Sequence, residues 1–108
     1  AEVPVDCLVA HVGTTGGGLA GSRTRSLKEA AGRAQEIMGA AKSAAKNILC
    51  LAHGGPFSAP EDTRYLYEHT DAQGFVGASS IERIPVERAI KEVVAGFKSI
   101  PLRNNQKI

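Results

Sequence analysis

Three short apolar runs divide the chain, and a helical pattern follows each of them. The runs cover residues 5–12, 48–52 and 74–78. They are continuous rather than alternating and end in turns that contain glycine, which is typical of parallel strands covered on both faces. We therefore expect three buried strands, near residues 5–12, 47–53 and 74–78.

The pattern after the first run predicts the best-defined helix. Apolar side chains recur at the i, i+3, i+4, i+7 spacing of one helical face from Leu27 to Ala45. Ser26 and Glu29 have the spacing of a capping box, in which each side chain binds the other residue's backbone N–H. We expect this helix to begin directly after Ser26.

Two further helices are expected. Ser58 and Glu61 repeat the capping spacing and predict a second helix that runs to about residue 68. Pro85 favours the start of a third helix, which should end before Pro101. The side chains expected to face the sheet are Leu66 with one or both of Tyr65 and Tyr67 in the second helix, and Val86, Ala89, Ile90, Val93, Val94 and Phe97 in the third.

The expected order is β-α-β-α-β-α, which requires right-handed crossovers and a parallel sheet. A chain of 108 residues accommodates one domain, here with a polar tail at residues 101–108. Three strands cannot close a barrel, because closure takes eight strands. The fold class is therefore α/β, as a small open sheet or as part of something larger.

Composition excludes several classes of partner. A formal net charge of +2 is too small to indicate nucleic acid or a membrane surface, and five aromatic residues without Trp argue against a single-strand nucleic-acid platform. No apolar stretch approaches the roughly 18 residues of a membrane span, and the first residues lack a signal-peptide pattern. We expect a cytoplasmic protein in which Cys7 and Cys50 are buried thiols rather than disulfide or zinc ligands.

Glycine-rich loops follow the strands, at the end where parallel α/β proteins bind ligands. Residues 13–25 form a long loop that is either a lid or phosphate cradle or merely a flexible surface loop. It matches neither the nucleotide P-loop nor the dinucleotide fingerprint. The basic residues of this region agree weakly with an anionic ligand; they are Arg23, Arg25, Lys28 and Arg33.

Two histidines end the first two strands. His53 precedes Gly54 and Gly55, which can adopt positive φ and so help to hold an oxyanion or phosphate, or can simply make the turn. His11 ends the first strand in the corresponding place, so we expect two imidazoles at one mouth, as an acid and base pair or sharing an anion. A metal site would need a third ligand. His69 is expected to interact only with the C-terminal end of its helix.

The third loop offers backbone donors and hydroxyls to an anion at a helix start. Its small residues are Gly77, Ala78, Ser79 and Ser80. Glu82 and Arg83 follow, and a local ion pair between them would only organise the loop. The three loops together indicate a small anionic or phosphorylated metabolite over the strand ends.

The amino-acid sequences of these loops resemble those of a known family. Residues 9–18 (VAHVGTTGGG), 51–62 (LAHGGPFSAPED) and 74–87 (GFVGASSIERIPVE) are similar to the phosphoenolpyruvate hydrolase-like TIM-barrel family, also found as the C-terminal domain of plant tobamovirus-resistance proteins. The resemblance implies that residues 1–108 form the last part of a (β/α)8 barrel, with strands six to eight. It places any magnesium ligands in the earlier units, outside this segment.

The resemblance implies a phosphoenolpyruvate- or pyruvate-type hydrolase or lyase. We expect His53 and His11 to transfer protons or act as electrophilic groups, and Glu82 to be an orienting residue. The 108-residue segment alone should be inactive and should associate with itself or be marginally stable, since a three-strand excerpt has two unpaired edges. The alternative is a non-enzymatic interaction module in plant antiviral resistance. The groups expected to hold the anion are the backbones of Gly54, Gly55, Gly77, Ala78 and Ser79 and the hydroxyl of Ser80.

Overall fold

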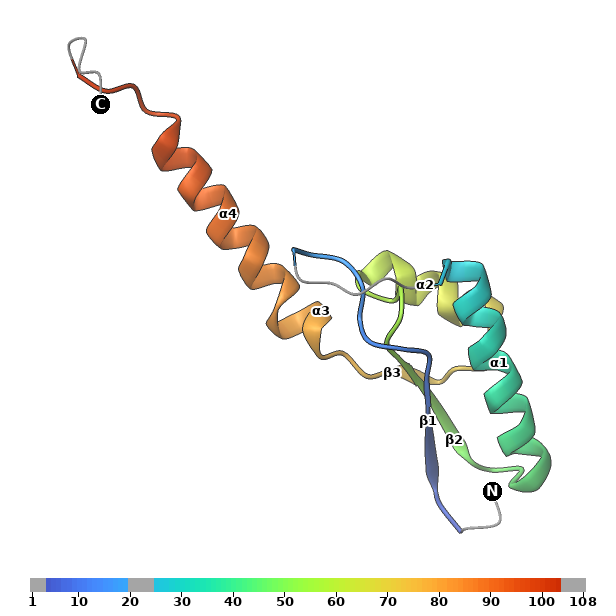
Figure 1. Cartoon of the computed structure of the whole chain (residues 1–108). Coiled ribbons are helices and arrows are strands. Elements are labelled where there is room, and N and C mark those ends of the chain that lie inside the picture. The colour runs from blue at the N-terminus through green and yellow to red at the C-terminus, as the bar shows by residue number, and fades with distance from the viewer. Residues whose placement is uncertain (1–3, 20–24, 104–108) are drawn as a thin grey trace.

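The computed structural model describes residues 4–19 and 25–103, which form an α/β structure (Figure 1). The three strands are parallel and lie in the order β1-β2-β3, as the sequence predicts. They are shorter than expected, and β3 has only two residues. The elements are β1 (Cys7–His11), α1 (Leu27–Ala44), β2 (Leu49–His53), α2 (Pro60–His69), β3 (Gly74–Phe75), α3 (Ser79–Glu82) and α4 (Ile84–Lys98).

The strand register places the loops after the strands at one edge of the sheet. His11 pairs with His53 at the ends of β1 and β2, and Ala52 pairs with Phe75 at the end of β3. Just beyond the strands, the Val76 N–H donates to the carbonyl of Ala52. Because all three strands point the same way, all three following loops leave from this edge.

One face of the sheet carries the core. Ala10 and Ala52 are register partners on this face, and both are fully buried. Their small side chains let α1 approach the sheet closely. The fully buried residues that pack with them include Ala30, Ala34 and Met38 of α1, Phe57, and Leu66 of α2.

The opposite face of the sheet is open in the described part of the chain. Val9 and Leu49 lie on it with more than two-fifths of their surface exposed, and His11 is also exposed. The expectation that helices cover both faces is therefore wrong for residues 4–19 and 25–103, because α1 and α2 both lie against the same face. Cys7 starts β1 on the open face and is exposed, contrary to prediction, whereas Cys50 is buried as predicted; both thiols are free.

The first two helices begin in different ways. The Ser26 hydroxyl accepts the Glu29 N–H at 3.2 Å, so Ser26 caps α1 as predicted, and this is the one bond of the expected capping box that the described residues show. The cap predicted for α2 from Ser58 and Glu61 is wrong, since this helix begins at Pro60 and its third residue is Asp62. The Asp62 carboxylate accepts the N–H groups of Ser58 at 3.0 Å and of Ala59 at 2.9 Å. In α2, Leu66 is fully buried and Tyr65 partly buried, while Tyr67 is exposed.

The last helix does not return to the sheet. α4 projects away from β3 and from α1 and α2 (Figure 1). The prediction that its apolar stripe is buried is wrong, because only Ile84 of this helix is buried in the described structure. Ile90 is 60% exposed and Phe97 is 77% exposed. None of the helices in residues 4–19 and 25–103 has the length and apolarity that a membrane-spanning helix requires.

Candidate functional site

Two imidazoles lie side by side at the ends of β1 and β2. The ring centroids of His11 and His53 are 4.9 Å apart, and the ring planes meet at 60°, in an edge-to-face arrangement. The sequence places these rings together because they end neighbouring parallel strands. His11 is exposed and His53 is half-buried.

The backbone assigns different proton positions to the two rings. Nδ1 of His53 lies 2.6 Å from the carbonyl oxygen of Val76. A carbonyl can only accept, so this nitrogen carries a proton and the neutral ring has its lone pair on Nε2. Nδ1 of His11 accepts the Gly13 N–H at 3.2 Å, so the neutral His11 ring carries its proton on Nε2. The pair therefore offers one donor and one acceptor.

Positive-φ glycines join the first and second loops. Gly54 and Gly55 have φ values of 87° and 60°. The Gly55 N–H donates to the Gly13 carbonyl at 2.9 Å, and the Gly16 N–H donates to the Gly55 carbonyl at 2.8 Å. A Cβ at Gly54 would lie 1.9 Å from the Gly13 oxygen. The turn thus needs glycine at this position, and an anion at the Gly55 N–H would have to compete with the Gly13 carbonyl.

The third loop turns directly into α3. A Cβ at Gly77 would lie 2.6 Å from the Ile81 side chain, and the Ala78 carbonyl accepts the N–H of Ile81 at 2.9 Å. Ser80 lines an apolar hollow of about 270 Å³ together with Ser58 and Phe75. The third loop is connected to the imidazoles through the bond from His53 to Val76, whereas Ser80 lies in a hollow beside α2.

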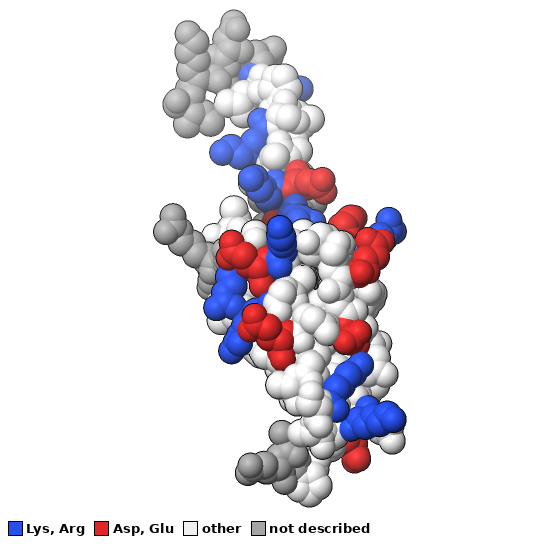
Figure 2. Space-filling view, turned by 90° about the vertical axis from the view of Figure 1, so that its right-hand side faces the viewer, with Lys and Arg blue, Asp and Glu red and all other residues white. Residues whose placement is uncertain are grey.

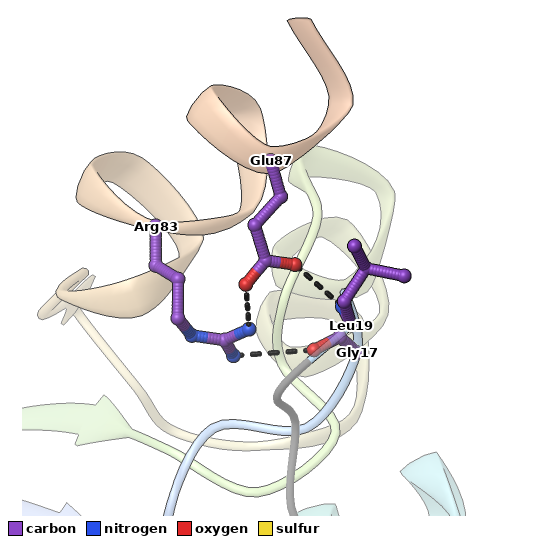
Figure 3. Close-up of polar contacts among 4 residues, drawn as sticks. All are labelled: Gly17, Leu19, Arg83 and Glu87. Atoms are coloured by element: carbon purple, nitrogen blue, oxygen red, sulfur yellow. Dashed lines mark hydrogen bonds and ion pairs between the residues drawn. The ribbon is translucent and has the colours of Figure 1, made fainter. Parts of the chain in front are cut away.

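An ion pair at the start of α4, between Arg83 and Glu87, holds the first glycine loop (Figure 3). Arg83 bonds the Glu87 carboxylate at 2.6 Å and the Gly17 carbonyl at 3.1 Å, and the other Glu87 oxygen accepts the Leu19 N–H. The two charged side chains are only 24% and 18% exposed. We call this group the Arg83–Glu87 clasp.

The clasp corrects the expected pairing of Arg83. The sequence suggested Glu82 as its partner, but Glu82 is exposed and the guanidinium bonds Glu87 instead. Four residues separate Arg83 from Glu87, which is the spacing that brings side chains together on a helix and could have identified the pair. Gly18 comes so close that a Cβ there would lie 2.5 Å from a Glu87 oxygen. The loop through Leu19 is therefore held in place rather than merely flexible.

A cleft of about 600 Å³ lies between the end of β1 and α1. His11, Gly55, Arg25 and Arg33 are among the residues that line it, so part of the predicted basic group does approach His11. Arg33 is paired with Glu36 at 3.0 Å, and Arg23 lies outside the described residues. Figure 2 shows charges of both signs interspersed on the side of the molecule where α1 lies. The cleft is polar but not strongly basic.

The third histidine has a structural role, as predicted. His69 ends α2, and its Nδ1 lies 2.8 Å from the Tyr65 carbonyl. Its ring stacks on that of Tyr65, with centroids 3.9 Å apart. It is a natural control for experiments on the other two histidines.

The rim of the sheet, meaning His11, His53 and the described loops after the three strands, does not fit a magnesium ion. Magnesium prefers an octahedron of oxygen ligands, usually including a carboxylate. The residues at the strand ends are two imidazoles without a carboxylate, and the described residues contain no cluster of three or more His, Cys, Asp and Glu that could hold a metal. The described residues at the strand ends therefore do not supply a magnesium site.

Parallel strands with helices packed on one face of the sheet and glycine loops at the strand ends define an α/β protein. The chain belongs to the phosphoenolpyruvate hydrolase-like family, whose model matches residues 1–100. This confirms the resemblance seen in the loop sequences.

The curated relatives are much longer than this chain. It is 42% identical to the ToMV resistance protein Tm-1(GCR237) and to the ToMV susceptible protein tm-1(GCR26) of Solanum lycopersicum, over 94% of this chain and 14% of each relative. It is 33% identical to the "Putative transcriptional regulatory protein y4pA" of Sinorhizobium fredii, over 93% of this chain and 17% of that protein. The chain thus spans about one-seventh of the length of the relatives it matches best among these.

Proposed function

We propose that this chain supplies the sixth, seventh and eighth βα units of a TIM barrel and binds a phosphorylated or carboxylate ligand at the C-terminal ends of their strands. The open sheet face supports the first part. In a barrel this face is the interior, where Val9 and Leu49 would pack against side chains of other strands. The parallel order β1-β2-β3 is that of successive barrel strands.

The observation that carries the ligand site is the pairing of the two imidazoles. His11 presents an N–H and His53 presents a lone pair, 4.9 Å apart between ring centroids. A ligand oxygen could accept from Nε2 of His11 while Nε2 of His53 exchanges a proton with the ligand or with water. The Val76 carbonyl would then stabilise the resulting imidazolium, because it already accepts the other proton of His53.

Backbone donors near these rings would hold the anion, and the Gly55 N–H would first have to release the Gly13 carbonyl that it bonds at 2.9 Å. The glycines of the second loop and residues 77–80 leave the same edge of the sheet as the histidines. In this proposal Glu82 orients the third loop. The reaction would be of the phosphoenolpyruvate or pyruvate type, a hydrolase or lyase reaction, with the remaining reactive groups outside this chain.

The relatives' names favour a second candidate. Two of them are called ToMV resistance and susceptible proteins, so the barrel could be retained as a non-enzymatic module that binds a protein partner. The two candidates differ in their response to small anions. A phosphate ester should protect the folded chain only if the rim is a ligand site.

Calorimetric titration of the chain with phosphoenolpyruvate and with inorganic phosphate tests the proposal. We expect binding that Gly77→Val and His53→Ala weaken, while the control His69→Ala leaves the affinity unchanged. Equal affinities for the unmodified chain and for His53→Ala and Gly77→Val, or the absence of binding with the fold intact, would reject the rim as the ligand site.

A further inference from the structure

Gly13 lies between the His11 ring and the second loop, and both of its backbone groups are bonded there. Its N–H donates to Nδ1 of His11 at 3.2 Å, and its carbonyl accepts the Gly55 N–H at 2.9 Å. The Gly55 N–H is one of the groups that the proposed function assigns to an anion. The Gly13 carbonyl thus takes the place that an anion oxygen would have at this N–H.

The bond between Gly13 and His11 depends on the protonation state of the ring. Nδ1 accepts a hydrogen bond only while it has a lone pair, and an imidazolium has an N–H at both nitrogens. Protonation of His11 therefore sets two donors against each other, and the Gly13 N–H has to turn away. His53 differs, because its Nδ1 already donates to the Val76 carbonyl and a second proton on Nε2 leaves that bond intact.

Gly13 has the freedom and the space to turn. Its φ is 116°, a value that suits glycine, and a Cβ built on it would meet nothing within 4 Å. The chain on either side is held, since the Val12 N–H donates to the His53 carbonyl at 3.0 Å and the Gly16 N–H donates to the Gly55 carbonyl at 2.8 Å. A movement of Gly13 can therefore stay confined to its own peptide groups.

We propose that His11 is a proton-dependent gate of the anion site. When its ring is protonated, Gly13 releases the Gly55 N–H, and a small oxyanion binds there in place of the Gly13 carbonyl. The inference rests on the proposed function for the position of the site and adds the proton that accompanies the ligand. Because binding linkage is reciprocal, the proton favours the anion to the same extent that the anion favours the proton.

The charged groups near His11 do not provide an alternative source of pH dependence at neutral pH. They have both signs, and one of the two arginines is bonded to Glu36 at 3.0 Å. Arginine and glutamate keep their charges near neutral pH, whereas histidine takes up a proton there. The change of charge therefore belongs to the two imidazoles. Among the described residues, the titratable and charged groups that face the His11 ring are His53 of β2 and, lining the same cleft on the side of α1, Arg25, Glu29 and Arg33.

Hydrogen exchange of the chain without ligand tests the gate. We expect the protection factor of the Gly55 amide to fall at least about fivefold between about pH 8 and about pH 5.5, in step with protonation of the His11 ring followed by its carbon-bound protons. The Val12 amide is the internal reference and should keep its protection, because it bonds a backbone carbonyl of β2. In His11→Asn, the side-chain oxygen can replace Nδ1 as the acceptor for Gly13 but takes up no proton, so Gly55 should stay protected.

Calorimetric titration with inorganic sulfate tests the ligand, since sulfate keeps its charge over this pH range. We expect the affinity of the unmodified chain to rise by up to about tenfold for each unit that the pH falls, the slope for one proton bound with each anion. His11→Asn should flatten this slope. His69→Asn is the matched control and should retain it, because His69 bonds the Tyr65 carbonyl within α2. Circular dichroism should show both variants folded, since both histidines are exposed.

Three results would overturn the gate. The first is constant protection of Gly55 while His11 titrates, and the second is a Gly55 amide that still opens at low pH in His11→Asn. The third is sulfate binding with an unchanged pH slope in His11→Asn, which would assign the proton to His53. If Gly55 opens with His11 but sulfate binds at no pH, the gate is confirmed and the ligand site of the proposed function is rejected instead.

Discussion

His11 and His53 lie edge to face across neighbouring strands, and each is held by a different backbone group. The Gly13 N–H donates to Nδ1 of His11, and Nδ1 of His53 donates to the Val76 carbonyl. The two histidines are register partners, yet their Nε2 atoms differ: that of His11 is a hydrogen-bond donor and that of His53 is an acceptor. This difference makes the pair suited to proton transfer.

The two rings should have different tautomers when neutral. We expect His53 to carry its proton on Nδ1 and His11 on Nε2, because of the backbone partners of each ring. Long-range nitrogen–proton correlation spectra of the neutral rings distinguish the two forms directly. Detection of the Nε2–H form at His53 would show that the Val76 bond does not exist in solution.

Gly54 should tolerate no side chain. We expect Gly54→Ala to lower the free energy of unfolding by at least about 2 kcal/mol, since the new Cβ would overlap the Gly13 oxygen at an unfavourable φ. Gly32→Ala in α1 is the control, because its Cβ meets nothing within 4 Å, and it should raise stability by about 0.5–1 kcal/mol. Urea unfolding measures both values, and an equal effect of the two changes would refute the close approach.

Asp62 should be the residue that caps α2. Asp62→Asn should cost about 1 kcal/mol, because it weakens the acceptor for the N–H groups of Ser58 and Ala59. Glu61→Gln removes a neighbouring charge from the same helical turn and should cost much less. A larger loss for Glu61→Gln in chemical unfolding would restore the cap that the sequence suggested.

The Arg83–Glu87 clasp should determine the local stability of the first glycine loop. Glu87→Gln should speed hydrogen exchange of the Leu19 amide by about five- to tenfold, corresponding to roughly 1 kcal/mol of a charge-assisted bond. Glu82→Gln serves as the control and should leave this amide unchanged. Unaltered Leu19 exchange in Glu87→Gln would mean that the loop is held without the clasp.

Sequence periodicity predicted the elements but not what covers them. The strand order and the Ser26 cap follow from local patterns, and the pairing of His11 with His53 follows from two parallel strands that end together. The apolar stripe of α4 is also visible in the sequence. However, a stripe shows which side of a helix is apolar and not which surface it meets, so its exposure could not be predicted.

The clasp shows a different limit of sequence reasoning. The spacing of Arg83 and Glu87 could indicate their ion pair, but the bonds to Gly17 and Leu19 join residues more than 60 positions apart. Such contacts depend on the path of the glycine loop over the sheet edge. The shifted cap of α2 is a local case, in which Pro60 sets the helix start and Asp62 rather than Glu61 becomes the third helical residue.

If the strand ends form a ligand site, a bound anion should change the amide chemical shifts of the loops that follow them. The isotopically labelled chain would be titrated with inorganic phosphate and then with phosphoenolpyruvate, with His69 and its stacked partner Tyr65 as the distant reference. We expect saturable shifts at residues 53–55 and 77–80 and no change at the reference. Shifts confined to sites away from these loops, with the rim amides unmoved, would contradict it.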